Sequence, residues 1–492
     1  MGEVPKISVE VVPEPPASGD LVEFVPEGKR VSSDIPEEEF RGKKLSTLLL
    51  REGGRRRLYV GLGPQESIGP AILRKASGAA VRSLVKIGAE QISILAQEWE
   101  DHLDAIVEGA LLGAYRFERY KPETLRSRTG LRQLWLCIAP RLRREAKEKA
   151  KLGQLVAEAT NLVRDLGNEP GNVIFPEALA ERAHQLAKEY GLSCRVFEPR
   201  ELEEKGFGGL LAVGSGSVHG PRLILLEYSG KDPGRPPIAL VGKAITFDSG
   251  GISLKPGERM DEMKFDKMGG CAVLGILCAA SRLQLPTRVV GVLAAAENLP
   301  GPSAYRPGDI IRTYDGNTIE VLNTDAEGRI VLADAIAYVK KEFRPSLIID
   351  LATLTGACIV ALGKEKAGLF TPDRELREAF WSLGEEVNNP VWPLPLGEEF
   401  DEQIKSDIAL VKNVGGKEGG ACTAAAFLQK WVGDTRWVHL DIAGPAWITK
   451  EVAYLEKGPT GFGVSLITRF LLGQANQAQR TKPSQKGSGR KR

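Results

Sequence analysis

The sequence is poor in histidine, the side chain on which many zinc sites depend. It has four histidines in 492 residues, and they lie far apart with no H-E-x-x-H motif and no cysteine cluster beside them. A histidine-built zinc site is therefore not expected. His439 lies in the apolar run W-V-H-L-D, and we interpret it as a hydrogen-bonded structural histidine.

Cysteine pairs and long apolar runs are also missing. The six cysteines are scattered without a C-x-x-C motif, which is typical of a reduced, intracellular protein whose cysteines pack as small apolar side chains. No apolar run approaches the length of a membrane span, and the acidic, proline-rich beginning has no secretory-signal pattern. We therefore expect a soluble, cytoplasmic protein with no membrane partner.

Neither sign of charge is in excess. Sixty-six Lys and Arg residues stand against 64 Asp and Glu residues, which gives a formal net charge of +2. This balance gives no reason to expect nucleic acid as the main partner. Residues 473–492 are polar and basic with almost nothing to bury. We predict a disordered tail there, and a nucleic-acid-binding arm is the less favoured alternative.

The length of the chain favours two domains, because 492 residues exceed one ordinary core. Residues 1–165 alternate short apolar runs with helix-period segments, and predict an N-terminal α/β domain. Within it, the charged stretch 141–166 is rich in helix formers and predicts a connecting helix. The breakers G-N-E-P-G-N at 167–172 mark the boundary, and 167–472 form the larger domain.

The larger domain has the pattern of alternating strands and helices. Its apolar strands lack a clean alternation, which favours a sheet buried on both faces. The predicted fold class is α/β, with a smaller α/β N-terminal domain and a larger catalytic α/β domain around a mostly parallel central sheet. The expected strands are 223–226, 238–241, 289–294, 347–350 and 437–440, and the expected helices are 176–190, 272–283, 331–343 and 423–432.

Polar side chains follow the predicted strand 238–241. Lys243 and Asp248 come after it, next to the paired glycines 250–251. The carboxyl end of a strand in an open α/β sheet is the usual place for an active site. Glycines there allow the backbone or a ligand to approach closely.

Further carboxylates follow along the chain. Asp266 precedes the predicted helix 272–283, and N-T-D-A-E-G-R at 323–329 carries Asp325, Glu327 and Arg329 at alternate positions. In an extended segment, such positions project to one side, so these three could share a cavity. Clustered carboxylates need cations to offset their repulsion, and oxygen-rich donors suit pairs of divalent ions.

Each piece also has a structural interpretation. Lys243 or Asp248 alone could be a loop charge, and 323–329 could be an ordinary helix start with acidic residues at its N-terminus. The residues by themselves support a metal-dependent hydrolase and nothing narrower.

Several longer motifs occur along the chain: E-G-A-L-L-G-A-Y-R-F-E-R-Y-K at 108–121, V-G-K-A-I-T-F-D-S-G-G-I-S-L-K-P at 241–256, M-K-F-D at 263–266, P-G-D-I at 307–310, N-T-D-A-E-G-R at 323–329, D-L-A-T-L-T-G-A at 350–357, G-G-A-C-T-A-A-A-F-L at 419–428 and H-L-D-I-A-G-P-A-W at 439–447. Together they resemble the motifs of the leucine aminopeptidase (cytosol aminopeptidase) family, in the family's order and over roughly residues 20 to 470.

The resemblance implies a centre of two divalent metal ions, with manganese or zinc as the main candidates and magnesium or cobalt as alternatives. One ion would be held by Lys243, Asp248, Asp266 and Glu327, and the second by Asp248, Asp325 and Glu327. A lysine binds a metal only through its neutral amine, so the pKa of Lys243 is expected to be strongly lowered.

The resemblance also implies the catalytic groups. Lys255 would polarise the scissile carbonyl, and Arg329 would hold a bicarbonate ion that acts as general base. The pocket for the first side chain would be lined by Met263, Leu354, Thr355 and Gly356. The implied activity is release of N-terminal, leucine-like residues from peptide substrates by a homohexamer of two stacked trimers.

The sequence departs from the family pattern at three places. Ala244 stands where many members have glycine, which matters if the backbone there has a positive φ. Lys267 and Gly270 replace the commoner choices in D-M-x-G-A, and Lys267 would either weaken the metal site beside Asp266 or point to solvent. Two alternatives to the aminopeptidase remain: a binding or scaffolding hexamer that contacts nucleic acid, and a different metallohydrolase such as a dipeptidase.

Overall fold

A six-stranded sheet forms the centre of the N-terminal domain, in the order β1-β6-β5-β2-β4-β3. The computed structural model describes residues 7–31, 35, 38–127, 130–140, 143–232 and 234–480. Neighbouring strands are parallel except β3 and β4, which are antiparallel. The strands are β1 (Ser8–Val12), β2 (Asp20–Pro26), β3 (Thr47–Glu52), β4 (Arg55–Gly63), β5 (Gln91–Leu95) and β6 (Gln133–Cys137).

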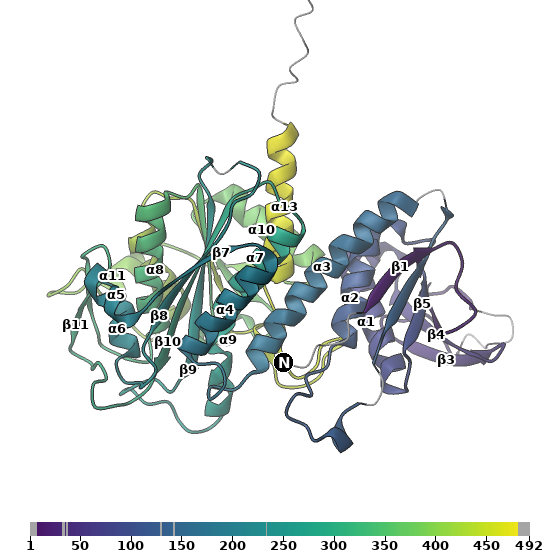
Figure 1. Cartoon of the computed structure of the whole chain (residues 1–492), viewed down its shortest axis with the longest axis horizontal. Coiled ribbons are helices and arrows are strands. Elements are labelled where there is room, and N and C mark those ends of the chain that lie inside the picture. Colours follow the sequence, from purple (N-terminus) through teal and green to yellow (C-terminus); the bar gives the residue numbers. More distant parts are fainter. Residues whose placement is uncertain are drawn as a thin grey trace, which may run out of the picture.

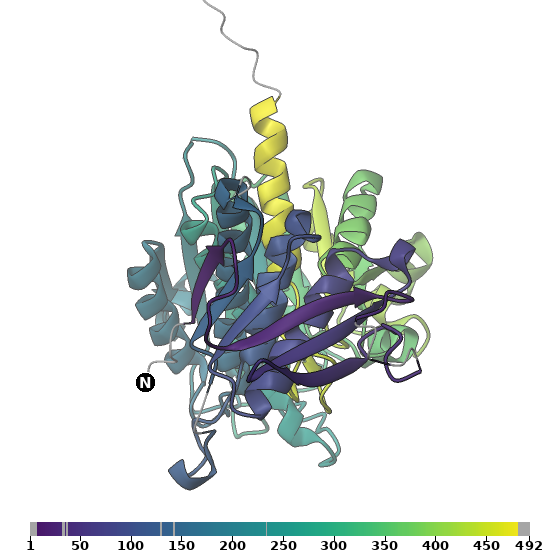
Figure 2. The same cartoon turned by 90° about the vertical axis from the view of Figure 1, so that its right-hand side faces the viewer.

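Two helices cover the face of this sheet that is turned towards the rest of the molecule. They are α1 (Pro70–Lys86) and α2 (Leu103–Ala114), which pack against each other over the sheet (Figure 1). Viewed from the side of this domain, the strands lie nearest the viewer (Figure 2). The helices therefore bury their apolar side chains against the sheet and turn their other side towards the second domain.

A long helix, α3 (Arg143–Asn168), lies between the two domains (Figure 1). It corresponds to the predicted connecting helix 141–166, of which residues 141 and 142 lie outside the described part of the chain. Its buried residues contribute to the core of both domains, because Ala146 and Ala150 pack with the N-terminal cluster and Val163 and Leu166 with the second.

Buried ion pairs also join the domains. Arg469, on the last helix, contacts Asp104 at 2.7 Å and Glu108 at 2.9 Å, both on α2. Glu108 also contacts Arg74 of α1 at 3.1 Å, and both side chains are almost fully buried. Removing one partner of such a group would leave an uncompensated buried charge, so the pairs fix how the domains meet.

An eight-stranded sheet forms the second domain, in the order β15-β14-β17-β13-β9-β10-β8-β7. The four central strands, β17, β13, β9 and β10, are parallel, and antiparallel pairs occur only towards the edges. The mostly parallel sheet predicted from the sequence is confirmed. Its strands are β7 (Ser193–Phe197), β8 (Arg222–Tyr228), β9 (Ile238–Asp248), β10 (Val289–Asn298), β13 (Leu347–Ala352), β14 (Ala367–Phe370), β15 (Val391–Pro393) and β17 (Trp437–Asp441).

Helices cover both faces of this sheet and bury two separate cores. One face carries α3 with α4 (Pro176–Tyr190), α7 (Met268–Arg282), α10 (Arg374–Glu386) and α13 (Val464–Arg480). The other carries α5 (Pro199–Lys205), α6 (Gly208–Gly214), α8 (Gly328–Phe343) and α12 (Gly420–Val432). Burial on both faces explains why the strands are continuously apolar.

Short elements complete the second domain. A three-stranded sheet of β11 (Ile310–Arg312), β12 (Thr318–Glu320) and β16 (Val411–Lys412) lies beside the main one. Further short elements are the helices η5 (Met260–Lys267), α9 (Gly356–Leu362) and α11 (Glu398–Gln403) and the strand pair β18 (Trp447–Ile448) and β19 (Gly458–Pro459).

The C-terminal segment differs from its prediction. Residues 473–480, which were predicted to be disordered, continue α13 as far as Arg480. Residues 481–492 of the predicted tail lie outside the described part of the chain. Within the described residues, no helix combines the length and apolarity that crossing a membrane would require.

Strand β9 and helix α7 touch where two departures from the family pattern lie. Ala244 is fully buried in β9 and does not have a positive φ, so the position needs no glycine. A Cβ atom added to Gly270 of α7 would stand 2.6 Å from the Cβ of Ala244, which is too close for two methyl groups. The methyl group on β9 therefore occupies the space that a methyl group on α7 would otherwise fill.

We expect Gly270→Ala to lower the free energy of unfolding by about 1–3 kcal/mol, because it overpacks this contact. The double variant Ala244→Gly/Gly270→Ala should recover most of the loss. Urea denaturation of the single and double variants measures both effects. Losses in the double variant that equal the sum of the single losses would contradict the compensation.

Candidate metal centre

Asp248 and Lys243 both lie on β9, but at different places along it. The strand is longer than predicted, so Lys243 lies near its middle and Asp248 is its last residue. Both side chains are buried. Asn298, the last residue of β10, pairs with Asp248 and donates a 2.8 Å hydrogen bond from Nδ2 to its Oδ1. The end of a central parallel strand thus fixes the orientation of the Asp248 carboxylate.

The glycine turn after β9 brings Lys255 back to Asp248. Gly250 has φ of +89° and donates its N–H to Asp248 Oδ1 at 2.9 Å. A side chain at Gly250 would also meet Asp325 Oδ1 at 2.9 Å, so glycine is required twice over. Lys255 N donates to Ser249 O at 2.9 Å, which closes the loop, and Lys255 Nζ lies 2.8 Å from Asp248 Oδ2.

The segment 323–329 is a turn that enters a helix and is not extended. Asp325 N donates to Asn323 Oδ1 at 2.8 Å, and Glu327 is the N-cap residue of α8. The alternate-position argument for this segment was therefore wrong, although Asp325 and Glu327 do meet Asp248. The next residue, Gly328, has no room for a side chain, because a Cβ atom there would lie 2.6 Å from Lys243 Cε.

Asp266 reaches the same place from the short helix η5 (Met260–Lys267), which precedes α7. Its Oδ1 accepts a 2.6 Å hydrogen bond from Thr353 Oγ1, and its Oδ2 lies 2.8 Å from Lys243 Nζ. Lys243 Nζ also contacts Glu327 Oε1 at 2.7 Å and donates to Thr353 O at 3.0 Å. Lys243 thus links two of the candidate ligands.

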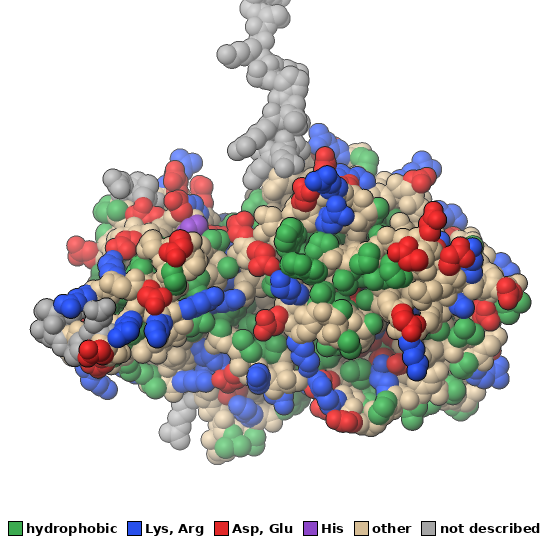
Figure 3. Space-filling view, turned by 180° about the vertical axis from the view of Figure 1, so that it is seen from behind, with side chains coloured by type: hydrophobic (Ala, Val, Ile, Leu, Met, Phe, Trp, Pro, Cys, Tyr) green, Lys and Arg blue, Asp and Glu red, His purple; other side chains and the backbone are tan. Residues whose placement is uncertain are grey.

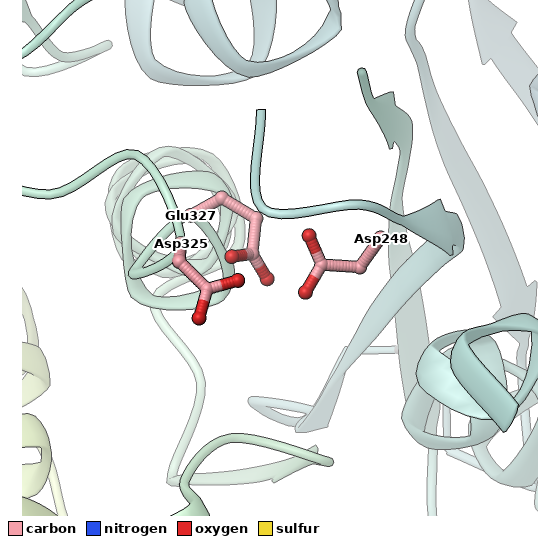
Figure 4. A group of neighbouring side chains, drawn as sticks. All are labelled: Asp248, Asp325 and Glu327. Carbon is pink, nitrogen blue, oxygen red and sulfur yellow. The ribbon is translucent and has the colours of Figure 1, made fainter. Parts of the chain in front are cut away.

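Three carboxylates point towards one another at the centre of this arrangement (Figure 4). Asp248, Asp325 and Glu327 each offer one oxygen within 4.8 Å of the others. Asp248 extends from the end of β9, Glu327 from the N-cap of α8, and Asp325 from the turn just before that helix. Lys255 contacts Asp325 as well as Asp248, so its ammonium group partly balances the cluster.

Burial and mutual repulsion raise the pKa values of these carboxyl groups. Burial, with Asp248 and Glu327 nearby, raises the pKa of Asp325 to about 6. Burial and Asp248 raise the pKa of Glu327, and burial raises that of Asp266. Glu327 Oε2 is buried and accepts no hydrogen bond. Carboxylates kept so close together, one with a free buried oxygen, fit divalent cations.

The same carboxylates also raise the pKa values of the two lysines, against the effect of burial. Burial lowers the pKa of Lys243, but Asp266, Glu327 and Asp248 together raise it above its ordinary value. Asp248, Glu327 and Asp325 likewise overcome burial and raise the pKa of Lys255. The lowered pKa expected for Lys243 therefore requires cations that take over the charge of the carboxylates, and it stays a prediction.

Arg329 is the second residue of α8, next to the centre. Its side chain is buried, and its Nη1 donates to Asn413 O at 2.8 Å. Burial lowers the pKa of Arg329 to about 10, which leaves the guanidinium charged at neutral pH. Its Nε is buried without a hydrogen-bond partner, so the group retains a donor for an anion.

The predicted pocket residues lie on segments next to the centre. Leu354, Thr355 and Gly356 follow β13, and Thr355 is the N-cap residue of α9. Asp441, at the end of β17, accepts hydrogen bonds from the N–H of Leu354 at 3.1 Å and from Thr355 Oγ1 at 2.6 Å. Met263 lies on η5, the helix whose Asp266 is tied to Thr353.

Three polar residues of this region were missed by the sequence analysis, namely Asn298, Asn413 and Asp441. Asn298 could have been found, because it follows the predicted strand 289–294 as Asp248 follows 238–241. Asp441 lies in the motif quoted at 439–447, where only the neighbouring His439 was discussed. Asn413 follows the two-residue strand β16, which leaves no recognisable pattern.

Lys267 points neither to solvent nor into the metal cluster. It is fully buried, and its Nζ donates to Glu169 O at 3.0 Å, to Gly167 O at 3.4 Å and to Lys264 O. The solvent alternative is therefore wrong: Lys267 binds carbonyl oxygens at and just beyond the end of α3. His439 is hydrogen-bonded through Nδ1 to Asp350 Oδ1 at 2.6 Å, which confirms its structural interpretation.

Comparison with known proteins gives matches over both domains. The sequence profile of the "Cytosol aminopeptidase family, catalytic domain" matches residues 161–468, and that of the N-terminal domain of the same family matches 17–124. A "Probable cytosol aminopeptidase" of Syntrophotalea carbinolica is 46% identical over 453 residues, which cover 90% of this chain and 91% of the relative. One from Aquifex aeolicus is 43% identical, covering 88% and 89%.

The fold matches a solved structure over most of its length. The bottromycin maturation enzyme BotP in complex with Mn superposes with a TM-score of 0.86 at 36% sequence identity. The match covers 93% of this chain and 100% of that chain.

The raised pKa values predict that metal stabilises the chain more at higher pH. Above its ordinary pKa of 3.8, the unfolded Asp325 has released a proton that the folded, metal-free chain still holds up to about pH 6. Across this range, its contribution to the stability of the metal-free fold falls as pH rises. Metal ions compete with protons for the same carboxylates, so the affinity for metal increases as pH rises.

The difference in Tm between Mn²⁺-loaded and chelator-treated protein should thus widen from about pH 5 to about pH 8. Thermal unfolding in a pH series, with and without excess chelator, measures it. A difference that is constant or shrinks over this range would contradict protonation of the cluster.

Proposed function

The chain belongs to the cytosol aminopeptidase family and is a metallo-aminopeptidase, and on that premise we propose that it removes leucine-like N-terminal residues from peptides by means of two divalent metal ions. The observation that carries the two-metal proposal is the close group of three carboxylates, the buried Asp248 and Glu327 and the partly exposed Asp325. Lys243 and Asp266 extend it on one side. Together they supply the ligands for two adjacent ions.

The proposed ligands divide into two overlapping sets. Lys243, Asp248, Asp266 and Glu327 would hold one ion, and Asp248, Asp325 and Glu327 the other. Manganese or zinc suits these oxygen-rich sets, with magnesium or cobalt as alternatives. Two bound ions would lower the pKa of a water molecule and supply a nucleophile at neutral pH.

Lys255 is proposed to act on the substrate carbonyl. It is the less buried of the two cluster lysines, with 22% of its side chain exposed, and a lysine ammonium group is charged at neutral pH unless its pKa is strongly lowered. A fixed ammonium group there would stabilise the oxyanion that forms as the peptide bond is attacked. Asp248 and Asp325 hold Lys255 in place through ion pairs.

Arg329 is proposed to bind bicarbonate, which would serve as general base. Its free buried Nε and its persistent charge support this role. Met263, Leu354, Thr355 and Gly356 are proposed to line the pocket for the first side chain. The hydrogen bonds of Asp441 to Leu354 and Thr355 give that loop a fixed shape.

The purified chain should release p-nitroaniline from leucine p-nitroanilide. Activity should disappear after chelation, return with Mn²⁺ or Zn²⁺, and be absent on the N-acetylated substrate, because the free amine is needed for binding. Asp325→Ala should abolish activity, because it removes a proposed metal ligand and one of the two ion pairs that hold Lys255. Metal content by elemental analysis accompanies the assay.

Two results would count against this proposal. Full activity in Asp325→Ala would remove the carboxylate cluster from the reaction. Hydrolysis of the N-acetylated substrate at the rate of the free one would indicate a different metallohydrolase on the same scaffold.

We propose that the chain assembles as a homohexamer. Large apolar side chains are exposed on and around the three-stranded sheet: Ile310, Leu322, Ile408 and Leu410. Ile252 and Leu254 flank Ser253, which is hydrogen-bonded to Thr324 of the metal loop, and both are exposed as well. Exposed apolar side chains in one region are typical of a protein interface.

Light scattering after size-exclusion chromatography should give six times the mass of one chain. Leu410→Glu should shift the population to smaller species, since it buries a charge in the interface, whereas Leu410→Met should not. A monomer in the unmodified protein would contradict the assembly.

Nucleic acid is not proposed as a partner. On the face shown in Figure 3, positive and negative side chains are intermingled, and hydrophobic side chains gather over the second domain. Most of the basic tail on which the nucleic-acid alternative rested lies outside the described residues.

A further inference from the structure

Asn413 lies at the junction between the three-stranded sheet and the metal loop. It follows β16, whose residues pair in parallel with β12. Its own N–H donates to Glu320 O, the last residue of β12, at 2.9 Å. Its side chain is fully buried although it is polar.

The side-chain amide continues this pairing where β12 has ended. Oδ1 accepts a hydrogen bond from Leu322 N at 2.8 Å, and Nδ2 donates to Asn323 O at 2.7 Å. Longer contacts reach Asn323 N at 3.4 Å and Ala326 O at 3.5 Å. An amide side chain offers both a donor and an acceptor, so Asn413 acts like one more peptide group of the sheet.

The backbone of Asn413 holds the other end of the same segment. Its carbonyl oxygen accepts the 2.8 Å hydrogen bond from Arg329 Nη1. Contacts from this one residue therefore reach from position 322 to position 329, and Asp325 and Glu327 lie between them.

Other residues support the loop at a different point. Asn298 Nδ2, Tyr305 Oη and Ser253 all bind Thr324, through its carbonyl oxygen, hydroxyl group or N–H. The flanking residues 322, 323 and 326 are contacted by Asn413. The ion pairs of Glu327 with Lys243 and of Asp325 with Lys255 act on the ends of the side chains. The backbone on either side of Thr324 is held by Asn413 against the repulsion from Asp248.

We propose that Asn413 is a positioning residue that holds the turn 322–327 so that Asp325 and Glu327 face Asp248 before metal arrives. This inference rests on the proposed metal centre and adds a residue to it. Preorganised ligands bind metal more tightly, since the chain does not have to be ordered during binding.

The chemistry of the amide makes the idea specific to asparagine. Asn413→Ala removes all side-chain hydrogen bonds. Asn413→Asp keeps the shape and the acceptor, but it loses the donor to Asn323 O and adds a further anion next to the cluster. Both variants are expected to weaken Mn²⁺ binding by about 10- to 100-fold, as loss of the residues that orient metal ligands generally does.

Titration calorimetry of Mn²⁺ into the chelator-treated, dialysed full chain measures the affinity. It is done for the unmodified protein and both variants, well below the Tm of each metal-free protein. The Mn²⁺ electron paramagnetic resonance spectrum of the loaded protein reports whether two ions remain coupled. We expect weaker binding and loss of the coupled signal in the variants.

Asp334→Asn is the matched control. Asp334 is also fully buried and lies on α8, but its carboxylate accepts hydrogen bonds from Leu210 N and Tyr314 N, both at 2.8 Å and away from the metal loop. It should lower the Tm of the metal-free protein without changing Mn²⁺ affinity.

The outcomes distinguish failure of the positioning role from failure of the proposed metal centre. Variants of Asn413 that bind Mn²⁺ as tightly as the unmodified protein, whatever their Tm, would overturn the positioning role alone. An unmodified protein that binds no Mn²⁺ would overturn the proposed metal centre and this inference with it. If Asn413→Ala fails to fold, Asn413→Asp decides the question.

Discussion

Repulsion among closely spaced carboxylates is the constraint on which the architecture around the centre depends. Asp248, Asp325 and Glu327 each offer an oxygen within 4.8 Å of the others, and Asp248 and Glu327 are buried while Asp325 is partly exposed. In such surroundings, like charges interact far more strongly than at a surface. The fold resists this force with two lysines and with backbone segments that are anchored from outside the cluster.

These anchors explain why segments distant in sequence converge here. The central strand β9 supplies Lys243 and Asp248, and its glycine turn returns Lys255 to the same place. Helix α8 supplies Glu327 at its first turn, and η5 supplies Asp266. A parallel sheet collects the ends of its strands at one edge, so a rigid scaffold can hold several charged groups that a single loop could not.

The sequence predicted those parts of the centre that follow from strand ends and local pattern. Asp248 after an apolar strand, the parallel sheet and the connecting helix were all accessible in this way. The geometry of 323–329 could not be predicted, because the same residue pattern is compatible with an extended segment and with the start of a helix. The environment of Lys267 could not be predicted either, because its three carbonyl partners are brought to it only by the fold. Asn413 acts on residues about 90 positions away, and no local pattern records such a contact.

The contact between Ala244 and Gly270 limits which single substitutions can connect this pair with the commoner family pair, glycine at 244 and alanine at 270. Alanine at both positions would place two Cβ atoms 2.6 Å apart in the core. Glycine at both would leave only a methyl-sized void, which costs about 1 kcal/mol. Of the two single-substitution intermediates between these pairs, the double glycine is therefore the less destabilising, because it leaves a small void where the double alanine would force a steric clash.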